Sequence, residues 1–170
     1  MRNFFSKYKY IIIVALFFGA GAILAGLPAN ILSGPAVSAE PLAEEKIAVP
    51  FVQIGRTKIP VEVARTEAAI QKGLSGRPSL DQKSGMLFIF PQKERYQFWM
   101  PDMYFPIDII WIDDGIIVDI AENVSNEFDP AKPRFYLPPN PINYVLEVNA
   151  GFTKKNGMGI GDRAVFKLNE

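Results

Sequence analysis

Two residue types are missing from this chain of 170 residues, which contains no cysteine and no histidine. Without cysteine there can be no disulfide, thiolate nucleophile, iron–sulfur cluster or thiolate zinc site. Without histidine the chain lacks the commonest general base and transition-metal ligand, and it cannot form a Ser-His or Cys-His dyad. Any catalysis would therefore depend on carboxylates, lysine, tyrosine or a hard cation such as calcium.

Acidic residues are absent from the first 39 positions, where three basic residues precede an apolar run from Tyr10 to Leu27 that ends at Pro28. Residues 36–39 read Ala-Val-Ser-Ala, the small-residue pattern that a signal peptidase accepts. This arrangement predicts a signal peptide over residues 1–39, cleaved before Glu40. We therefore expect an extracytoplasmic protein, either periplasmic or secreted.

The alternative is an uncleaved membrane anchor formed by residues 10–27. As a helix this run would reach about 27 Å, slightly less than the roughly 30 Å of a typical hydrocarbon core. Its three glycines and Pro28 favour the cleaved leader. Both interpretations place residues 40–170 beyond the membrane, and only the anchor would keep the protein attached to it.

Residues 40–46 are polar and predict a flexible tether, which leaves residues 47–170 as one domain. Because the leader holds three of the 18 Lys and Arg residues and none of the 18 Asp and Glu residues, residues 40–170 carry 15 basic and 18 acidic side chains. Nucleic acid binding rests on clustered Lys and Arg, so no nucleic acid partner is expected. No cofactor or metal site is expected either.

The domain alternates short apolar segments with turn residues, which predicts short antiparallel strands. Thr66 is a typical N-cap for a helix over 67–72, and a second helix is predicted over 150–156. Pro60 suggests that its strand lies at a sheet edge or carries a bulge. The fold class is therefore α+β, mainly β, with partial closure into a barrel as one option. The predicted strands are 51–54, 57–64, 86–90, 96–100, 107–112, 116–121, 144–148 and 164–168.

The segment from Ser125 to Asn143 contains five prolines, too many for the interior of a sheet. Long loops without structure of their own are often functional. Three interpretations remain open: a rigid surface connection, a wall of a binding site, or a docking surface for another exported protein.

Several short motifs occur in a series that resembles a known family. They are Gly85-Met-Leu-Phe88, Phe98-Trp-Met100, Ile107-Asp-Ile-Ile110, the Asp-Gly turn, Tyr144–Gly151 and Gly161-Asp162. Their order is similar to that of the domain-of-unknown-function 192 family, DUF192, from about residue 61 to 166. The resemblance implies a small β-rich domain, frequently exported, without an established activity.

The chain departs from that family's pattern in two places. Leu74-Ser75-Gly76 precedes Arg77 where the family often has Leu-Met, and Pro101-Asp102-Met103 follows Trp-Met where the family often has Lys-Asn-Thr. If the lysine or asparagine of that family motif contacts a ligand, the same contact is not expected in this chain.

Asp108 begins a strand that is apolar on both faces, where a carboxylate is costly to bury unless it is satisfied. The simpler interpretation is a structural carboxylate that caps the turn over 103–106. The functional one is an acid or ligand group of a site.

Glu147 shares a strand face with Val145 and Asn149, and a solvated outer face explains it most simply. If that face lined a cleft together with Asp108, the two carboxylates would converge, as glycoside hydrolysis or calcium binding requires.

Three further side chains are candidates for binding. Trp99 and Trp111 can stack on sugar rings, although tryptophans among apolar residues mostly belong to the core. Arg77 can bind an anionic group, although a surface salt bridge is the simpler interpretation.

The leading hypothesis is a non-enzymatic exported module that binds cell-envelope or glycan material, with Trp99, Asp108, Glu147 and Arg77 as candidate binding residues. The alternatives are a hydrolase that uses Asp108 and Glu147, and a module that docks another exported protein through residues 125–143. Whether the protein is an enzyme at all stays open, and the missing residue types argue against it.

Overall fold

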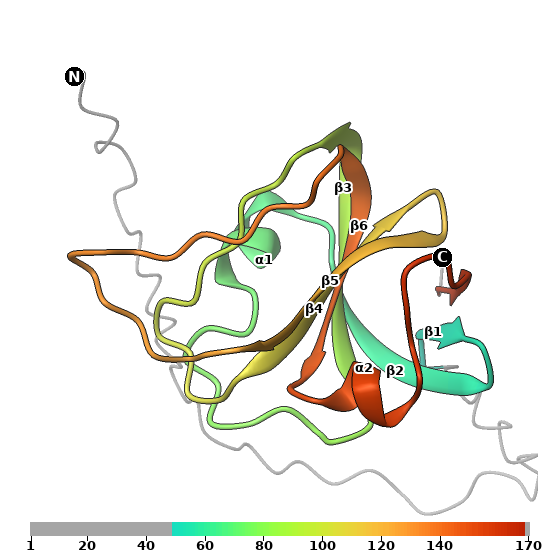
Figure 1. Cartoon of the computed structure of the whole chain (residues 1–170), viewed down its shortest axis with the longest axis horizontal. Helices are drawn as coiled ribbons and strands as arrows, with labels where there is room; N and C mark the ends of the chain where they lie inside the picture. Colours follow the sequence, from blue (N-terminus) through green and yellow to red (C-terminus); the bar gives the residue numbers. More distant parts are fainter. Residues whose placement is uncertain (1–48, 169–170) are drawn as a thin grey trace, which may run out of the picture. The chain divides into compact units, whose positions relative to one another are not determined.

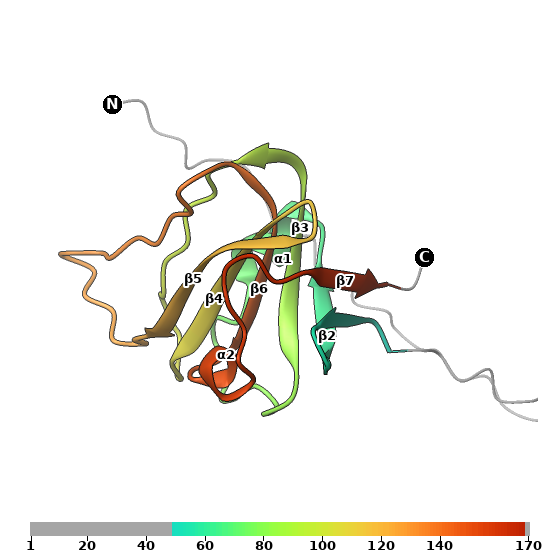
Figure 2. The same ribbon diagram turned by 45° about the vertical axis from the view of Figure 1, so that its right-hand side comes forward.

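A computed structural model of the chain describes residues 49–168, so the predicted leader and tether lie outside the described residues. None of the helices in this range is long and apolar enough to span a membrane. Seven strands form one sheet in the order β5-β4-β6-β3-β2-β1-β7, and Figures 1 and 2 show that it curls strongly. The mainly β, single-domain prediction is confirmed. The elements are β1 (Phe51–Ile54), β2 (Thr57–Ala64), α1 (Glu67–Lys72), β3 (Gly85–Glu94), β4 (Ile107–Asp113), β5 (Ile116–Val124), β6 (Ile142–Asn149), α2 (Phe152–Lys155) and β7 (Ala164–Lys167).

Helix α1 has the bounds that its capping residues predict. The Thr66 side chain accepts a hydrogen bond from the backbone N–H of Ala69 at 3.2 Å, and Gly73, with φ of 47°, ends the helix. The helix lies in the connection between β2 and β3, which pair in parallel through residues 61–64 and 85–88. The sheet is therefore mixed, and our prediction of antiparallel strands throughout was wrong at this pair. A parallel pair needs such a crossover, which here carries α1.

The two faces of the sheet bury separate groups of apolar side chains. The face beside α1 contains Phe88, Ile107, Ile109 and Trp111. The opposite face, beside α2, contains Leu87, Ile110, Ile112 and Leu146. Since neighbouring residues of a strand point to opposite faces, this division shows the orientation of each side chain of β3, β4 and β6.

Two local predictions were wrong. Residues 96–100 form no strand, and only Phe98 makes an isolated bridge, to Tyr136. Pro60 lies in a strand that has neighbours on both sides in the sheet order. The proline is tolerated because β2 pairs with β1 through residues 57–60 and with β3 only from Val61 onwards.

Candidate functional site

Asp108 is a fully buried carboxylate whose two oxygens are satisfied by the backbone and by one hydroxyl. Oδ1 accepts the N–H groups of Asn123 at 2.8 Å and Gly151 at 3.0 Å. Oδ2 accepts the N–H of Thr153 at 3.0 Å and its hydroxyl at 2.7 Å. Asp108 therefore joins the end of β5 to the turn before α2. These partners differ from the turn over 103–106 that we expected it to cap.

Glu147 is also buried, with only 6% of its surface exposed, so the solvated outer face predicted for it was wrong. Among the described residues, neither of its carboxyl oxygens has a hydrogen bond or an ion pair. Because burial disfavours the charged form, the pKa of Glu147 rises to about 8. At neutral pH the free site therefore holds mainly the protonated acid.

The two buried acids belong to opposite faces of the sheet. Asp108 pairs with Val148 across β4 and β6, whereas Glu147 pairs with Ile109. Val148 belongs to the core beside α2, and Ile109 to the core beside α1. Since paired residues share a face and neighbours alternate, Asp108 and Glu147 point away from each other. They form no shared site, so the two-carboxylate hydrolase has no structural basis here.

Glu147 lines a cavity of about 240 Å³ on the α1 side of the sheet, which we call the aromatic pocket. Residues 70–75 at the end of α1 form one wall, and residues 96–101 with Met103 form another. Phe88 and Phe90 of β3 complete it. The volume lies just below the roughly 300–1,000 Å³ typical of ligand pockets, which suits one ring or a chain end.

The aromatic rings of the pocket hold one another in place. The rings of Phe90 and Tyr96 are stacked with centroids 3.6 Å apart. Phe98 meets Phe88 edge to face at 5.4 Å and Phe90 at 6.4 Å. These contacts fix the walls in advance, which lowers the entropic cost of binding.

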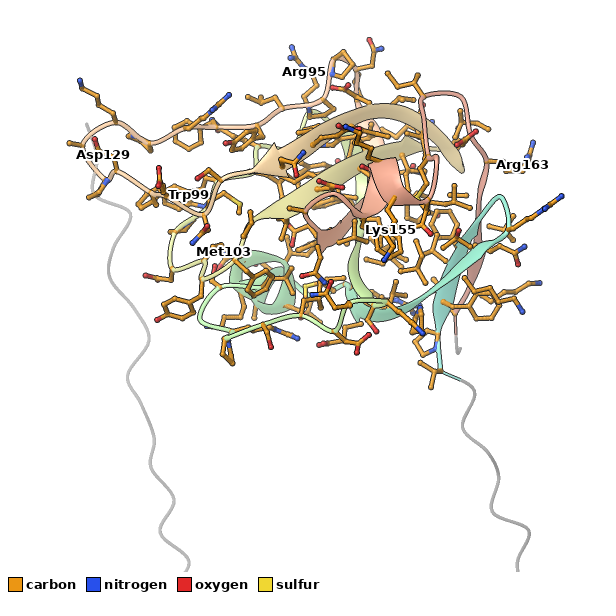
Figure 3. The ribbon with its side chains drawn as sticks, turned by 60° about the horizontal axis from the view of Figure 1, so that its bottom comes forward. Arg95, Trp99, Met103, Asp129, Lys155 and Arg163 are labelled. Atoms are coloured by element: carbon orange, nitrogen blue, oxygen red, sulfur yellow. The ribbon has the colours of Figure 1, made fainter. Side chains whose placement is uncertain are left out.

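Trp99 lies at the pocket and is 52% exposed, unlike Trp111, which is 2% exposed within the core. Its ring stacks against Phe135 at 5.9 Å and meets Phe128 edge to face at 5.8 Å. Both phenylalanines belong to the proline-rich segment, and Figure 3 shows Trp99 beneath the outer part of that segment. The predicted core position is therefore correct for Trp111 and wrong for Trp99.

The proline-rich segment is tied to the strip of chain that carries Trp99. The N–H of Phe98 donates to the carbonyl of Tyr136 at 2.9 Å, and the N–H of Tyr136 donates back at 2.8 Å. The segment extends well beyond the sheet in both Figures 1 and 2. It therefore borders the pocket while exposing much of its own surface.

The two departures from the family pattern meet at the pocket wall. The hydroxyl of Ser75 donates to the carbonyl of Pro101 at 3.0 Å, and the N–H of Gly76 donates to the carbonyl of Asp102 at 2.8 Å. Asp102 adopts a φ of 55°, unusual for a residue other than glycine. Ser75 and Pro101 both line the pocket, so this contact joins its two walls.

Arg77 lies outside this pocket and is already paired. Its guanidinium forms two hydrogen bonds with the carboxylate of Glu62, one of them 2.7 Å long. The pair lowers the pKa of Glu62, chiefly through these hydrogen bonds. The surface salt bridge that we took as the simpler interpretation is thus present, and Arg77 is not part of the candidate site.

A second cavity, of about 310 Å³, lies beside α2 and is lined by Lys58, Lys83 and Lys155. Two of its amide side chains are occupied: that of Asn149 donates to the carbonyls of Leu80 and Asp81, and that of Asn156 donates to the carbonyl of Phe152. The aromatic pocket holds a buried carboxyl with a raised pKa and a half-exposed tryptophan, which this cavity lacks, so we prefer the aromatic pocket as the functional candidate.

The sequence alone identified two members of the pocket, Trp99 and Glu147, and missed the rings that surround them. Phe88, Phe90 and Phe98 looked like strand residues because apolar runs are typical of buried strands. Their one distinguishing signal was the density of aromatics over residues 88–99, interrupted by a charged stretch at residues 93–95.

The comparisons with known proteins agree on the fold and give no activity. The DUF192 family profile (uncharacterized ACR, COG1430) matches residues 51–166. A crystal structure of a proposed transcription regulator from Sinorhizobium meliloti 1021 is 32% identical, with a TM-score of 0.63, over 69% of this chain and 92% of its own.

A protein of unknown function from Novosphingobium aromaticivorans is 31% identical, with a TM-score of 0.62, over 68% of this chain and 83% of its own. No curated protein matches the sequence. The match over most of the domain and the similarity of these structures establish that the chain belongs to the DUF192 family.

Proposed function

We propose that the protein is an exported, non-enzymatic binding module whose aromatic pocket receives one ring or chain end of a cell-envelope glycan. The half-exposed Trp99 beside a preformed aromatic cavity carries this proposal. A sugar ring presents an apolar face that stacks on an aromatic ring and an edge of hydroxyl groups that need hydrogen bonds.

Polar groups for that edge are available within the pocket. Gln97 contributes an amide group, and the buried acid of Glu147 offers both a donor and an acceptor when protonated. A few polar groups among apolar walls are the usual composition of a small-molecule site.

Calorimetric titration of the purified protein with peptidoglycan fragments and short envelope polysaccharides tests this function. We expect saturable binding that Trp99→Ala weakens about tenfold, which corresponds to about 1.4 kcal/mol of lost stacking and contact. Tyr104→Ala is the matched control, because Tyr104 is also an exposed aromatic but does not line the pocket. The proposal fails if no fragment binds or if both variants bind like the wild type.

The export component of the proposal rests on the leader. We expect the protein in the extracytoplasmic fraction, with a mature N-terminus at Glu40 by mass spectrometry. A full-length chain in the membrane fraction would indicate the anchor instead, and a full-length chain in the cytosol would contradict export.

A second candidate function is the docking of another exported protein on the proline-rich segment. Phe135 and Leu137 favour it, because these apolar side chains are 43% and 42% exposed. Leu137→Ala separates the two functions, since Leu137 does not line the aromatic pocket. A protein partner would lose affinity with this variant, whereas a glycan held by the pocket would not.

A further inference from the structure

We infer that the ligand group entering the aromatic pocket is positively charged, as in the ammonium of an amino sugar. This inference rests on the proposed binding function and adds to it the charge of the ligand.

The first observation is the isolation of Glu147. A buried carboxyl without a partner is costly, and removing it would normally benefit the fold. Glu147 is buried on the pocket wall, and within residues 49–168 no cation contacts it. A partner that arrives with the ligand would satisfy this acid.

The two cationic side chains closest in sequence to this wall, Lys72 and Arg77, form no ion pair with Glu147 in the described structure. Lys72 lines the pocket, but its Nζ lies beside Gly76, within 3.1 Å of the position that a β-carbon there would occupy. It makes no ion pair with Glu147 in the described structure. Arg77 is engaged by Glu62.

The second observation is the nature of the walls. The pocket brings five aromatic residues, Phe88, Phe90, Tyr96, Phe98 and Trp99, around the one carboxyl group in its lining. Aromatic faces attract cations through the ring quadrupole, and more strongly where water is excluded. Rings and one acid together match an ammonium better than they match a neutral hydroxyl group.

The third observation predicts how binding depends on pH. Because the pKa of Glu147 is about 8 in the free protein, an arriving cation must displace a proton at neutral pH. Affinity for a cation that does not titrate should therefore rise by up to tenfold per pH unit below about 8, then level off.

The phenol of Tyr96 also lines the pocket, and it stays neutral over this range. Burial raises the pKa of Tyr96 above its usual value near 10. The expected pH dependence therefore belongs to Glu147.

The test compares choline with 3,3-dimethyl-1-butanol, which has the same shape without the charge. At pH 8 we expect choline to bind at least tenfold more tightly than the neutral alcohol. We also expect choline itself to bind more than tenfold more tightly at pH 8 than at pH 6. Glu147→Gln should abolish the dependence on pH and reduce the preference for choline to what the aromatic rings alone provide, whereas Glu122→Gln, an exposed acid on β5, should keep both at the wild-type level. Trp99→Ala should weaken choline binding without disturbing the fold, because Trp99 is half exposed.

The inference would be overturned if the two probes bound with equal affinity or if neither bound. It would also be overturned if Glu147→Gln bound choline with the affinity and pH dependence of the wild type. The glycan titration is a separate measurement with separate ligands. If neutral fragments bind while choline has no advantage, the charge inference fails and the binding function stands. If choline binds but no envelope fragment does, the glycan function fails instead.

Discussion

At the scale of single residues, the domain treats its two buried acids in opposite ways. Asp108 receives four hydrogen bonds and links strand β5 to the turn before α2. Glu147, one strand away and on the other face, receives none within the described structure. An acid bonded in this manner stabilises the fold, whereas a desolvated acid on a cavity wall, with a raised pKa, is typical of functional sites.

The raised pKa of Glu147 predicts an unusual dependence of stability on pH. Between about 4.5 and 8 the folded state keeps a proton that the unfolded state releases, so the free energy of unfolding falls as pH rises through this window. Glu147→Gln removes the effect and should be more stable than the wild type at pH 8, by about 4 kcal/mol. Urea unfolding of the wild type and of Glu147→Gln at pH 5 and pH 8 measures this difference in the free energy of unfolding. A wild type as stable at pH 8 as at pH 5 would contradict the burial argument.

Replacing Asp108 should have the opposite effect on stability. Asp108→Ala leaves four donors without an acceptor in the core, which should lower the free energy of unfolding by about 3–5 kcal/mol. Asp119→Ala is the control, since its side chain accepts one local hydrogen bond, from the N–H of Ile120. Thermal unfolding of both variants should separate them clearly. Similar losses would show that Asp108 has no special structural role.

At the scale of elements, the pocket depends on a close contact between β3 and β6. A β-carbon at Gly85 would lie 2.7 Å from the carbonyl oxygen of Glu147 and 3.0 Å from the side chain of Leu146. Glycine therefore lets the two strands approach at the point where β6 presents Glu147 to the pocket. The crossover that carries α1 supplies the opposite wall.

Gly85→Ala should push β6 away from β3 and destabilise the domain by about 1–3 kcal/mol, as overpacking usually does. Gly159→Ala is the matched control, because a β-carbon there would meet nothing within 4 Å and its backbone is unstrained. Denaturant unfolding compares the two variants. If Gly85→Ala proved no less stable than Gly159→Ala, the close approach of β3 and β6 would be unimportant.

Elements with strong local signals could be predicted from the sequence. The cap at Thr66 and the glycine at position 73 determine both ends of α1, and the Asp114-Gly115 turn, with φ values of 46° and 79°, determines the hairpin of β4 and β5. Each of these features depends on neighbouring residues alone, so local reasoning was sufficient.

Features that depend on distant residues could not be predicted. The parallel pairing of β2 with β3 follows from where the chain returns after α1, which no local pattern encodes. The alternation of β6 correctly placed Glu147 beside Val145 on one face, but it could not show that α1 and residues 96–101 cover that face. The burial of Glu147, and with it the candidate site, therefore appears only in three dimensions.

At the scale of the whole domain, the two faces of the curled sheet have different roles. On the face beside α2, the hydrogen bonds of Asp108 hold the start of the helix against the sheet. The cavity next to α2 is lined by polar groups and lysines. The face beside α1 keeps an aromatic cavity with an unsatisfied acid and a half-exposed tryptophan at its edge. In Figure 3, Trp99 and Met103 lie toward the proline-rich segment, far from Arg163.

The most direct test is to map the bound ligand by nuclear magnetic resonance, following the backbone amides while an envelope glycan fragment is added. Our account predicts that shift changes concentrate at residues 70–75, residues 96–101 and the part of β6 around Glu147. Changes that gather instead around Lys58 and Lys155, or none at saturating ligand, would contradict the aromatic pocket as the binding site.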